Sequence, residues 1–384
     1  MTRAMDLDHS HPALGDLRAA CRRRVPRFVW EYLDSATGDE TVKHANREAL
    51  DAVRLIPAVL RGPVAPDLAT PLLGGHFAAP FGIAPVGMSG LVWPGAEAML
   101  ARAAAVAGIP YCFSTVATRL PEEIGPLAGA MGWFQLYPPK DAGIRRDLLA
   151  RARAAGFGTL VLTVDVPGPS RRERQRRSGL TIPPRLTPAM LWQIACRPRW
   201  ALGTLRAGAP RLRLMEGYAP QAAGRADSTA HVGYLLRAAP DWAYLAALRA
   251  EWQGPLVVKG VLEPADATRL KAEGVDGVWV SNHGGRQFDA APAVAHVLPA
   301  IRAAVGEGYP IIADGGVESG LDVLRLIALG ADMAMLGRGF HVALGAFGAP
   351  GAAHLVHILR ADMEAAMVQM GISLPAGARG RLVA

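Results

Sequence analysis

The sequence is poor in cysteine. Its 384 residues include only Cys21, Cys112 and Cys196, which lie far apart and form no C-x-x-C pair. This spacing argues against a disulfide framework and against a zinc site, and it favours a reducing compartment such as the cytoplasm. We therefore expect a functional site without a metal ion.

Long hydrophobic runs are also missing. The N-terminus mixes charged residues such as Arg3 and Asp6 with no apolar core, so no signal peptide is predicted. The most apolar window, residues 99–117, contains Arg102 and Pro110 and predicts a helix, a turn and a strand. No segment is expected to span a membrane.

Acidic residues are outnumbered. There are 33 Asp and Glu against 41 Lys and Arg, a formal net charge of +8. A basic balance favours anionic partners such as phosphate, carboxylate, nucleic acid or an anionic lipid surface, but it does not choose among them.

Eight short apolar runs are present, each ending in Gly, Pro or a polar residue and separated by Ala/Leu/Arg-rich stretches with helical spacing. Continuous rather than alternating hydrophobicity is typical of parallel strands covered on both faces. The runs are Pro80–Val86, Ile109–Ser114, Gly132–Tyr137, Thr159–Val166, Pro255–Gly260, Gly277–Ser281, Pro310–Asp314 and Asp332–Gly337.

This order predicts an α/β fold, a (β/α)₈ TIM barrel forming one domain over residues 1–384. Two Rossmann-like halves are the alternative, but residues 84–90, after the first strand, do not fit G-x-G-x-x-G, and no Walker A sequence occurs. Within the domain we expect an N-terminal helical extension over 1–75, including a helix at Gly15–Tyr32, and the barrel over 76–371.

A long insert over residues 168–240 interrupts the fourth β–α unit. It begins with a run of arginines and continues with Trp192 and Trp200 among Arg and Pro. A loop of this length is either a lid, a binding element or a solvated loop with a few docked aromatics. Basic residues interleaved with tryptophans also suit peripheral contact of residues 180–215 with an anionic membrane.

Barrel enzymes place reactive groups where strands end. We therefore expect the polar residues at these positions to converge on one face, although Asp314 could instead cap a helix. The candidates are Ser114, Gln135, Tyr137, Thr163, Asp165, Lys259, Ser281, His283, Asp314, Gly337 and Arg338.

The segment Val280–Asp289, which reads VSNHGGRQFD, resembles the active-site signature of the FMN-dependent 2-hydroxy-acid dehydrogenases and oxidases. Supporting motifs follow in family order at Trp133–Tyr137, Leu162–Asp165, Val258–Gly260, Asp314–Gly316 and Leu336–Arg338. The resemblance covers residues 16–371. The insert is most similar to those of the lactate and mandelate dehydrogenases.

The resemblance implies the catalytic roles. His283 would be the base beside the carbinol carbon, since an imidazole titrates near neutrality. Asp165 would stabilise the imidazolium that forms. Lys259 would lie by the flavin, where a fixed cation favours the reduced state.

The resemblance also implies the binding residues. Arg286 and Arg172 would hold the substrate carboxylate and Tyr137 would donate a hydrogen bond to it; a run of solvated charges is the other interpretation of Arg172. The expected FMN-binding residues are Pro85, Val86, Gly87, Ser114, Gln135, Thr163, Lys259, Ser281, Asp314, Gly315, Gly316, Gly337 and Arg338.

Three positions depart from the family pattern. Trp30 aligns where the family has a Tyr that contacts the substrate carboxylate, so we expect a different pocket wall there. Glu318 stands where an Arg often binds the FMN phosphate, which leaves Arg338 and backbone amides to hold it. Gly87 replaces a common Ala and leaves more room over the flavin.

These features predict FMN-dependent oxidation of an L-2-hydroxy acid to the 2-oxo acid. The electrons would pass to a quinone, another carrier or oxygen. A relative with a larger or atypical substrate, and a catalytically decayed flavin-barrel binding protein, are the alternatives. The resemblance implies a homotetramer and no nucleic-acid partner.

Overall fold

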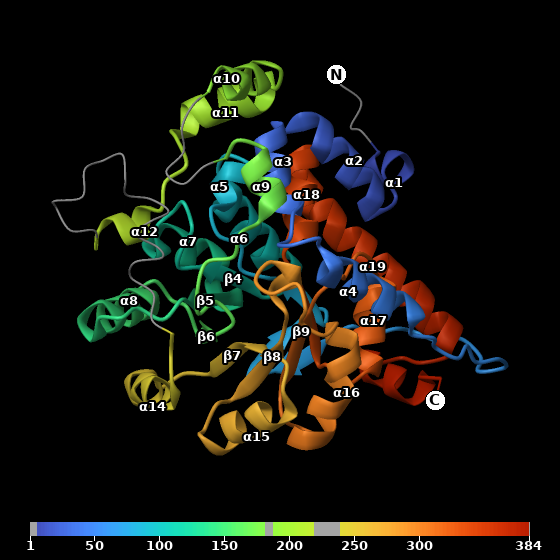
Figure 1. The fold of residues 1–384 in the computed structure, drawn as a ribbon. Helices are drawn as coiled ribbons and strands as arrows, with labels where there is room; N and C mark the ends of the chain where they lie inside the picture. Colours follow the sequence, from blue (N-terminus) through green and yellow to red (C-terminus); the bar gives the residue numbers. More distant parts are fainter. Residues whose placement is uncertain (1–5, 181–186, 219–238, 384) are drawn as a thin grey trace.

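The computed structural model describes residues 6–180, 187–218 and 239–383, and its centre is a closed barrel of eight parallel strands (Figure 1). The strand order is β10-β3-β4-β5-β6-β7-β8-β9, so β10 pairs with β3 to close the barrel. The strands are β3 Phe81–Ile83, β4 Tyr111–Ser114, β5 Gly132–Leu136, β6 Thr159–Thr163, β7 Leu256–Val261, β8 Gly277–Val280, β9 Ile311–Asp314 and β10 Met333–Leu336. All eight predicted strands, and the TIM barrel, are confirmed.

Helices surround the barrel, one or more following each strand. They are α5 Ser89–Val92 and α6 Ala96–Ala107 after β3, α7 Pro121–Ala128 after β4, α8 Ala142–Ala154 after β5, α14 Trp242–Glu251 before β7, α15 Pro264–Ala272, α16 Val294–Val305, α17 Gly320–Ala328, α18 Arg338–Phe347 and α19 Ala349–Met370. The short 3₁₀ segments are η1 Gly129–Met131, η2 His283–Gly285 and η3 Pro375–Arg381.

The barrel interior is filled by side chains rather than open. Cys112, Trp133, Val161 and Trp279 belong to one buried cluster, which a hairpin of β1 Thr70–Leu72 and β2 Gly75–Phe77 extends through Leu72 and Phe77. A second, larger cluster fills the space between strands and helices. Because the interior is packed, only the mouth at the carboxyl ends of the strands can take a ligand.

The N-terminal extension departs from its predicted helix. Instead of one helix at Gly15–Tyr32, the chain forms α2 Leu14–Arg24 and α3 Arg27–Asp34, preceded by α1 Leu7–Ser10. Pro26 separates the two, because proline lacks an N–H and disfavours helical backbone in the preceding residue. A further helix that the sequence analysis missed, α4 Thr41–Ala52, lies against the barrel mouth.

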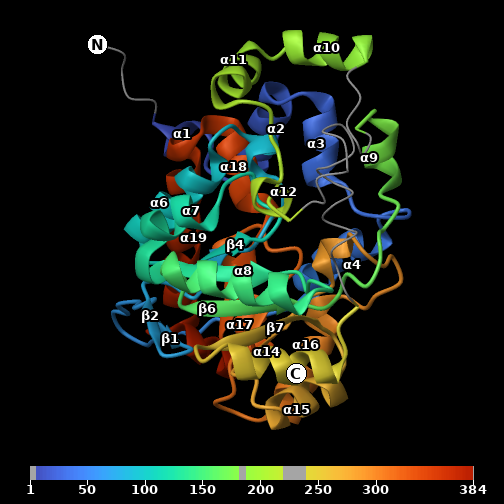
Figure 2. The ribbon, with the colours of Figure 1, turned by 90° about the vertical axis from the view of Figure 1, so that its left-hand side faces the viewer.

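Much of the described insert is helical. It contains α9 Glu173–Arg177, α10 Pro188–Ala195, α11 Pro198–Ala207 and α12 Arg213–Glu216, while its residues 181–186 and 219–238 lie outside the described residues. Figures 1 and 2 both place α10 and α11 at the outer edge of the molecule, beyond α3. Trp200 attaches this part, since its indole N–H donates to Leu91 O at 3.1 Å and its ring packs edge-on against Phe28.

Candidate active site

Polar side chains on consecutive strands form a hydrogen-bonded row beneath the barrel mouth. Ser114 Oγ donates to Gln135 Oε1 at 2.9 Å, and Gln135 Nε2 donates to Thr163 Oγ1 at 3.0 Å. All three are buried at the ends of β4, β5 and β6. Because each side chain fixes the next, this row offers a rigid polar edge to anything bound above it.

A second row crosses β7, β8 and β9. Lys259 Nζ donates to Ser281 Oγ at 2.7 Å and lies 3.3 Å from Asp314 Oδ2, and Ser281 Oγ donates to Asp314 Oδ1 at 2.7 Å. Burial alone would lower the pKa of Lys259, but the carboxylates of Asp314 and Asp165 raise it above its ordinary value. The structure therefore holds a buried, charged ammonium at the mouth, and Asp314 is its partner rather than a helix cap.

His283 and Asp165 form a directed pair. His283 Nδ1 lies 3.0 Å from Asp165 Oδ1 and 3.1 Å from Oδ2. Since an ionised carboxylate only accepts, Nδ1 carries the proton and Nε2 is left with its lone pair. Burial lowers the pKa of His283 despite the raising effect of Asp165, so the imidazole is neutral at pH 7. The left-handed backbone of His283, with φ of 55°, is the kind of local strain found at functional sites.

Three guanidinium groups face the cavity without a carboxylate at ion-pair distance among the described residues. Arg286 donates through Nη1 to Tyr32 O and Ser35 O, both at 2.9 Å, and Arg338 donates to Ser35 O and Gly284 O, both at 3.0 Å. Arg172 donates through Nε only to a serine hydroxyl. Unpaired cations in a buried cleft mark places that anions fill.

Burial and the positive charges in the cavity lower the pKa of Arg286. Burial and then the nearby charges of Arg172 and Arg338 lower the pKa of Arg286 to about 9. The group is still protonated at neutral pH. A bound anion would relieve the unfavourable charge around it.

A cavity of about 350 Å³ joins these groups. Of the predicted residues, its wall contains Pro85, Val86, Gly87, Tyr137, Arg172, Lys259, His283, Arg286, Asp314, Gly315, Gly316, Gly337 and Arg338. Ser114, Gln135, Thr163 and Ser281 lie buried behind the wall, and Asp165 lies behind His283. The structure thus brings the predicted site together, with one exception.

The exception is Trp30, which does not line the cavity. Its side chain packs into the core, and Tyr32, two residues later in α3, lines the cavity instead, with its hydroxyl donating to Gly87 O at 2.7 Å. Side chains two positions apart on an α-helix point about 200° away from each other. Only one of Trp30 and Tyr32 can therefore face the cavity. The prediction that Trp30 forms the pocket wall is therefore wrong, and a tyrosine, Tyr32, lies there instead.

Sequence reasoning also missed residues that the extension brings to the cavity. Arg18 from α2, and Lys43, Asn46 and Arg47 from α4, all line it. Arg18 forms an ion pair with Glu318, whose carboxylate offsets part of the positive charge that lines the cavity. No local pattern in the sequence could identify these contacts, because they join segments about 300 residues apart.

The residues present fit a phosphorylated flavin. Gly315 and Gly316 have φ of 113° and 80°, and a Cβ on Gly316 would lie 2.9 Å from Asn46 O, so the backbone here forms a tight glycine cradle. Arg338, which has no carboxylate partner among the residues described, stands at this end of the cavity and suits a phosphate. The two polar rows and Lys259 would face the ring system. Barrels commonly hold phosphate after their last two strands.

Fold and site together define an α/β-barrel oxidoreductase that uses a bound cofactor. Residues 21–383 match the model of the FMN-dependent dehydrogenase family, so the chain belongs to that family and FMN is its cofactor.

Named relatives match most of the chain. The chain is 41% identical to an L-lactate dehydrogenase of Caulobacter vibrioides, over 93% of each protein, and 40% identical to one of Serratia proteamaculans, over 93% of this chain and 94% of that relative.

Solved structures agree. An (S)-mandelate dehydrogenase described as a monotopic membrane protein matches with a TM-score of 0.91 and 32% identity, covering 97% of this chain and 98% of that one. A mandelate oxidase matches with a TM-score of 0.81 and 34% identity, over 97% of each chain. Within the described part of this chain, no helix is long and apolar enough to cross a membrane.

Proposed function

We propose that this enzyme oxidises an L-2-hydroxy acid to the 2-oxo acid. One observation carries the proposal: a neutral imidazole oriented by Asp165 lies in the same cavity as the guanidinium groups of Arg286 and Arg172. Within the described part of the chain, neither guanidinium has a carboxylate at ion-pair distance. A base beside an anion site is the pairing that a hydroxy acid requires. The named relatives, lactate and mandelate enzymes, support the same substrate class.

In this proposal His283 Nε2 takes a proton from the substrate as R–CH(OH)–COO⁻ loses two electrons and two protons. FMN, when bound, supplies the electron acceptor. Asp165 stabilises the imidazolium through the 3.0 Å contact at Nδ1. The positive charge on Lys259 offsets negative charge that accumulates nearby during reduction.

The carboxylate is assigned to Arg286 and Arg172. Arg286 uses Nη1 for the carbonyls of Tyr32 and Ser35, so Nε and Nη2 can face a ligand. A guanidinium edge matches a carboxylate with two parallel hydrogen bonds. Tyr137, which lines the same cavity, is assigned a hydrogen bond to the bound acid.

The substituent of the hydroxy acid faces an apolar part of the wall. Met88, Val116 and Leu212 line the cavity, and Leu212 comes from the insert just before α12. Gly87 adds room, because a Cβ there would lie 2.7 Å from Val116 Cγ2. An apolar substituent such as methyl or phenyl fits this wall better than a charged one.

The proposal is tested by anaerobic reduction of the purified holoenzyme. We expect the flavin absorption bands to bleach with at least one member of a panel of L-2-hydroxy acids, and His283→Asn to keep the colour and lose the bleaching by a factor of about 10³ or more. A colourless protein that does not take up FMN would indicate a decayed barrel. Bleaching only by larger or carboxylate-free alcohols would indicate an atypical substrate.

Peripheral membrane attachment through the insert belongs to the same proposal. In α10 and α11, Leu191, Trp192, Leu202 and Leu205 are each more than half exposed, with Arg206 beside them. Exposed apolar residues flanked by cations suit the surface of an anionic bilayer.

Attachment to a membrane favours a lipid-soluble quinone as electron acceptor over another carrier or oxygen. Mixing the reduced enzyme with each acceptor and following reoxidation distinguishes the three.

Self-association into a homotetramer is proposed as well. Ile56, Leu60, Leu374 and Val383 expose apolar side chains where the segment after α4 meets the C-terminus, joined by Ile56 N donating to Arg381 O at 2.7 Å. Clustered apolar residues on a surface are typical of protein contacts. Analytical ultracentrifugation of the wild type and of Leu60→Glu tests this; a wild-type monomer would refute it.

A further inference from the structure

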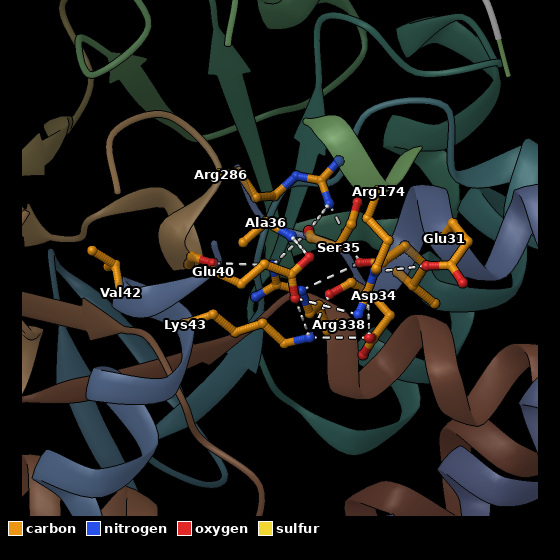
Figure 3. Close-up of polar contacts among 12 residues, drawn as sticks. Glu31, Asp34, Ser35, Ala36, Glu40, Val42, Lys43, Arg174, Arg286 and Arg338 are labelled. Atoms are coloured by element: carbon orange, nitrogen blue, oxygen red, sulfur yellow. Dashed lines mark hydrogen bonds and ion pairs between the residues drawn. The ribbon is translucent and has the colours of Figure 1, made fainter. Parts of the chain in front are cut away.

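Three carboxylates of the N-terminal extension gather around one arginine of the insert (Figure 3). The carboxylates are Glu31, Asp34 and Glu40, and their side chains are only 10–13% exposed. Lys43 Nζ lies 3.0 Å from Asp34 Oδ2 and 3.4 Å from Glu40 Oε2, and Arg18 binds Asp34 from the other side. We call these three acids the acidic cluster.

Arg174, in α9, contacts every member of the acidic cluster. It pairs with Asp34 through Nη2, and Nη1 lies 3.3 Å from Glu40 Oε2. Its Nε lies 2.6 Å from Glu31 Oε2, close enough for an ion pair although not aligned as a hydrogen bond. Without Arg174, the one ion-pair partner left to Glu31 among the described residues would be Arg27, at 4.0 Å.

The backbone around Arg174 is fixed to the same extension. Arg172 N donates to Thr37 Oγ1 at 3.2 Å, and Glu173 Oε2 accepts from Gly38 N at 2.9 Å. These contacts hold the first turn of α9 against residues 37 and 38. Arg172 itself has left-handed backbone, with φ of 47°, which needs such support in a residue other than glycine.

Electrostatics oppose the position of Arg172. Its charge is near enough to lower the pKa of both His283 and Arg286, after the larger effect of burial. Before substrate binds, the two guanidiniums repel each other across the cavity with no carboxylate between them among the described residues. An attractive contact elsewhere on α9 is therefore needed to keep Arg172 facing inward.

We propose that Arg174 is a positioning residue: its contact with the acidic cluster holds Arg172 beside Arg286, so that both guanidiniums meet the substrate carboxylate. This inference rests on the proposed function and adds how the carboxylate site is assembled. Arg174 does not line the cavity. We assign its effect on binding to Arg172, and its removal should weaken binding of the substrate carboxylate more than the proton transfer at His283.

Arg177 provides a matched control on the same helix. It is exposed and makes no ion pair within the part of the chain that the structure describes. Arg177→Gln therefore removes the same charge from α9 without touching the acidic cluster. Arg174→Lys keeps the charge but cannot reach three carboxylates with one planar group.

The test measures equilibrium binding of oxalate to the oxidised holoenzyme through the flavin spectrum, alongside anaerobic flavin reduction by the best 2-hydroxy acid. For Arg174→Gln we expect the Kd for both ligands to rise about tenfold, with the limiting reduction rate within about threefold of wild type. Arg174→Lys should recover part of the affinity and Arg177→Gln should bind as wild type. FMN content and Tm report folding.

Wild-type affinity in Arg174→Gln, or an equal loss in Arg177→Gln, would overturn the proposal. If Arg174→Gln does not fold, Glu31→Gln takes its place and should raise the oxalate Kd several-fold. In a folded set, the losses in Glu31→Gln and Arg174→Gln should be non-additive, whereas strict additivity would contradict the pairing. If no 2-hydroxy acid reduces the wild type, the proposed function fails, while oxalate binding still tests the role of Arg174.

Discussion

His341 is a fully buried imidazole beside the cofactor end of the barrel. Nε2 lies 2.7 Å from Ser89 Oγ and Nδ1 lies 2.8 Å from Gly337 O, so it joins the loop after β3 to the start of α18. Burial lowers the pKa of His341 to about 4 from an ordinary value near 6.5. The folded protein therefore keeps His341 neutral where the unfolded chain protonates it.

This difference predicts a pH-dependent stability. Between about pH 4 and 6.5 the unfolded state binds the extra proton, so the free energy of unfolding rises with pH there and levels off above. The contribution should differ by about 2 kcal/mol between about pH 5 and pH 7.5, measured by urea unfolding. His341→Leu should remove that slope and Ser89→Ala should retain it. Equal slopes in wild type and His341→Leu would contradict the assignment.

Glu318 gives a second prediction for a single residue. Its carboxylate pairs with Arg18 at the end of the cavity assigned to the FMN phosphate. Glu318→Gln removes one negative charge there and frees Nη2 of Arg18 for the phosphate, while Nη1 stays paired with Asp34. Because the side chain is 45% exposed and screened, the Kd for FMN should fall only about threefold, measured by quenching of flavin fluorescence on the apoprotein. Glu307→Gln, which removes an exposed carboxylate paired with Arg379, should leave it unchanged.

Residue identities in the site were largely predictable from the sequence because barrel strands deliver them in order. His283, Lys259 and Asp314 follow apolar runs, and parallel strands end at one face. Which side of α3 faces the cavity was not predictable in the same way. Trp30 and Tyr32 are both aromatic residues in a short helix, and only packing decides that Tyr32 faces the cavity.

At the scale of elements, α4 and the loop after β9 depend on each other. Arg47 Nη1 donates to Gly316 O at 2.6 Å, and Asn46 exchanges hydrogen bonds with Asn282. A Cβ on Gly316 would meet Asn46 O at 2.9 Å, which is backbone and cannot rotate away. The loop can therefore hold its shape only while α4 stays in place.

Gly316→Ala tests this dependence. Gly308 has the same φ of 80° but open space around it, so Gly308→Ala carries the backbone strain alone, about 1 kcal/mol. Gly316→Ala should lose more stability and raise the Kd for FMN about tenfold or more, because α4 or the glycine loop must move. Calorimetry of both variants measures the loss of stability, and flavin titration measures the Kd for FMN. Indistinguishable variants would show that α4 does not constrain the loop.

Elements differ in how far their sequence specifies them. The eight strands are apolar runs whose ends are marked by Gly, Pro or polar residues, and each was found. By contrast, α4 has a mixed sequence, and its helix is stabilised by packing on η2, α16 and α17, segments more than 230 residues away. Ion pairs such as Arg174 with Asp34 join residues 140 positions apart, which no local pattern can predict.

For the whole molecule, the exposed face of α10 and α11 predicts where membranes attach. The double variant Trp192→Glu, Leu205→Glu should lose most co-sedimentation with phosphatidylglycerol vesicles. It replaces apolar side chains that would enter the bilayer surface with negative charges, which the anionic lipid repels. Val106→Glu changes an even more exposed residue, on α6, and should pellet as wild type. High salt should weaken binding of the wild type. Unchanged pelleting of the double variant would remove the membrane role from this face.

The C-terminal end of α3, residues 32–35, has a thermodynamic consequence for the holoenzyme. Its carbonyls receive both Arg286 and Arg338, whose charges repel. An anion on either arginine reduces that repulsion, so cofactor phosphate and substrate carboxylate should bind with positive linkage. Linkage is reciprocal, so oxalate should lower the Kd for FMN by the same factor as FMN lowers the Kd for oxalate. Less FMN should then dissociate when the holoenzyme is diluted in the presence of oxalate. The resting enzyme would therefore keep its cofactor most firmly when its substrate is abundant.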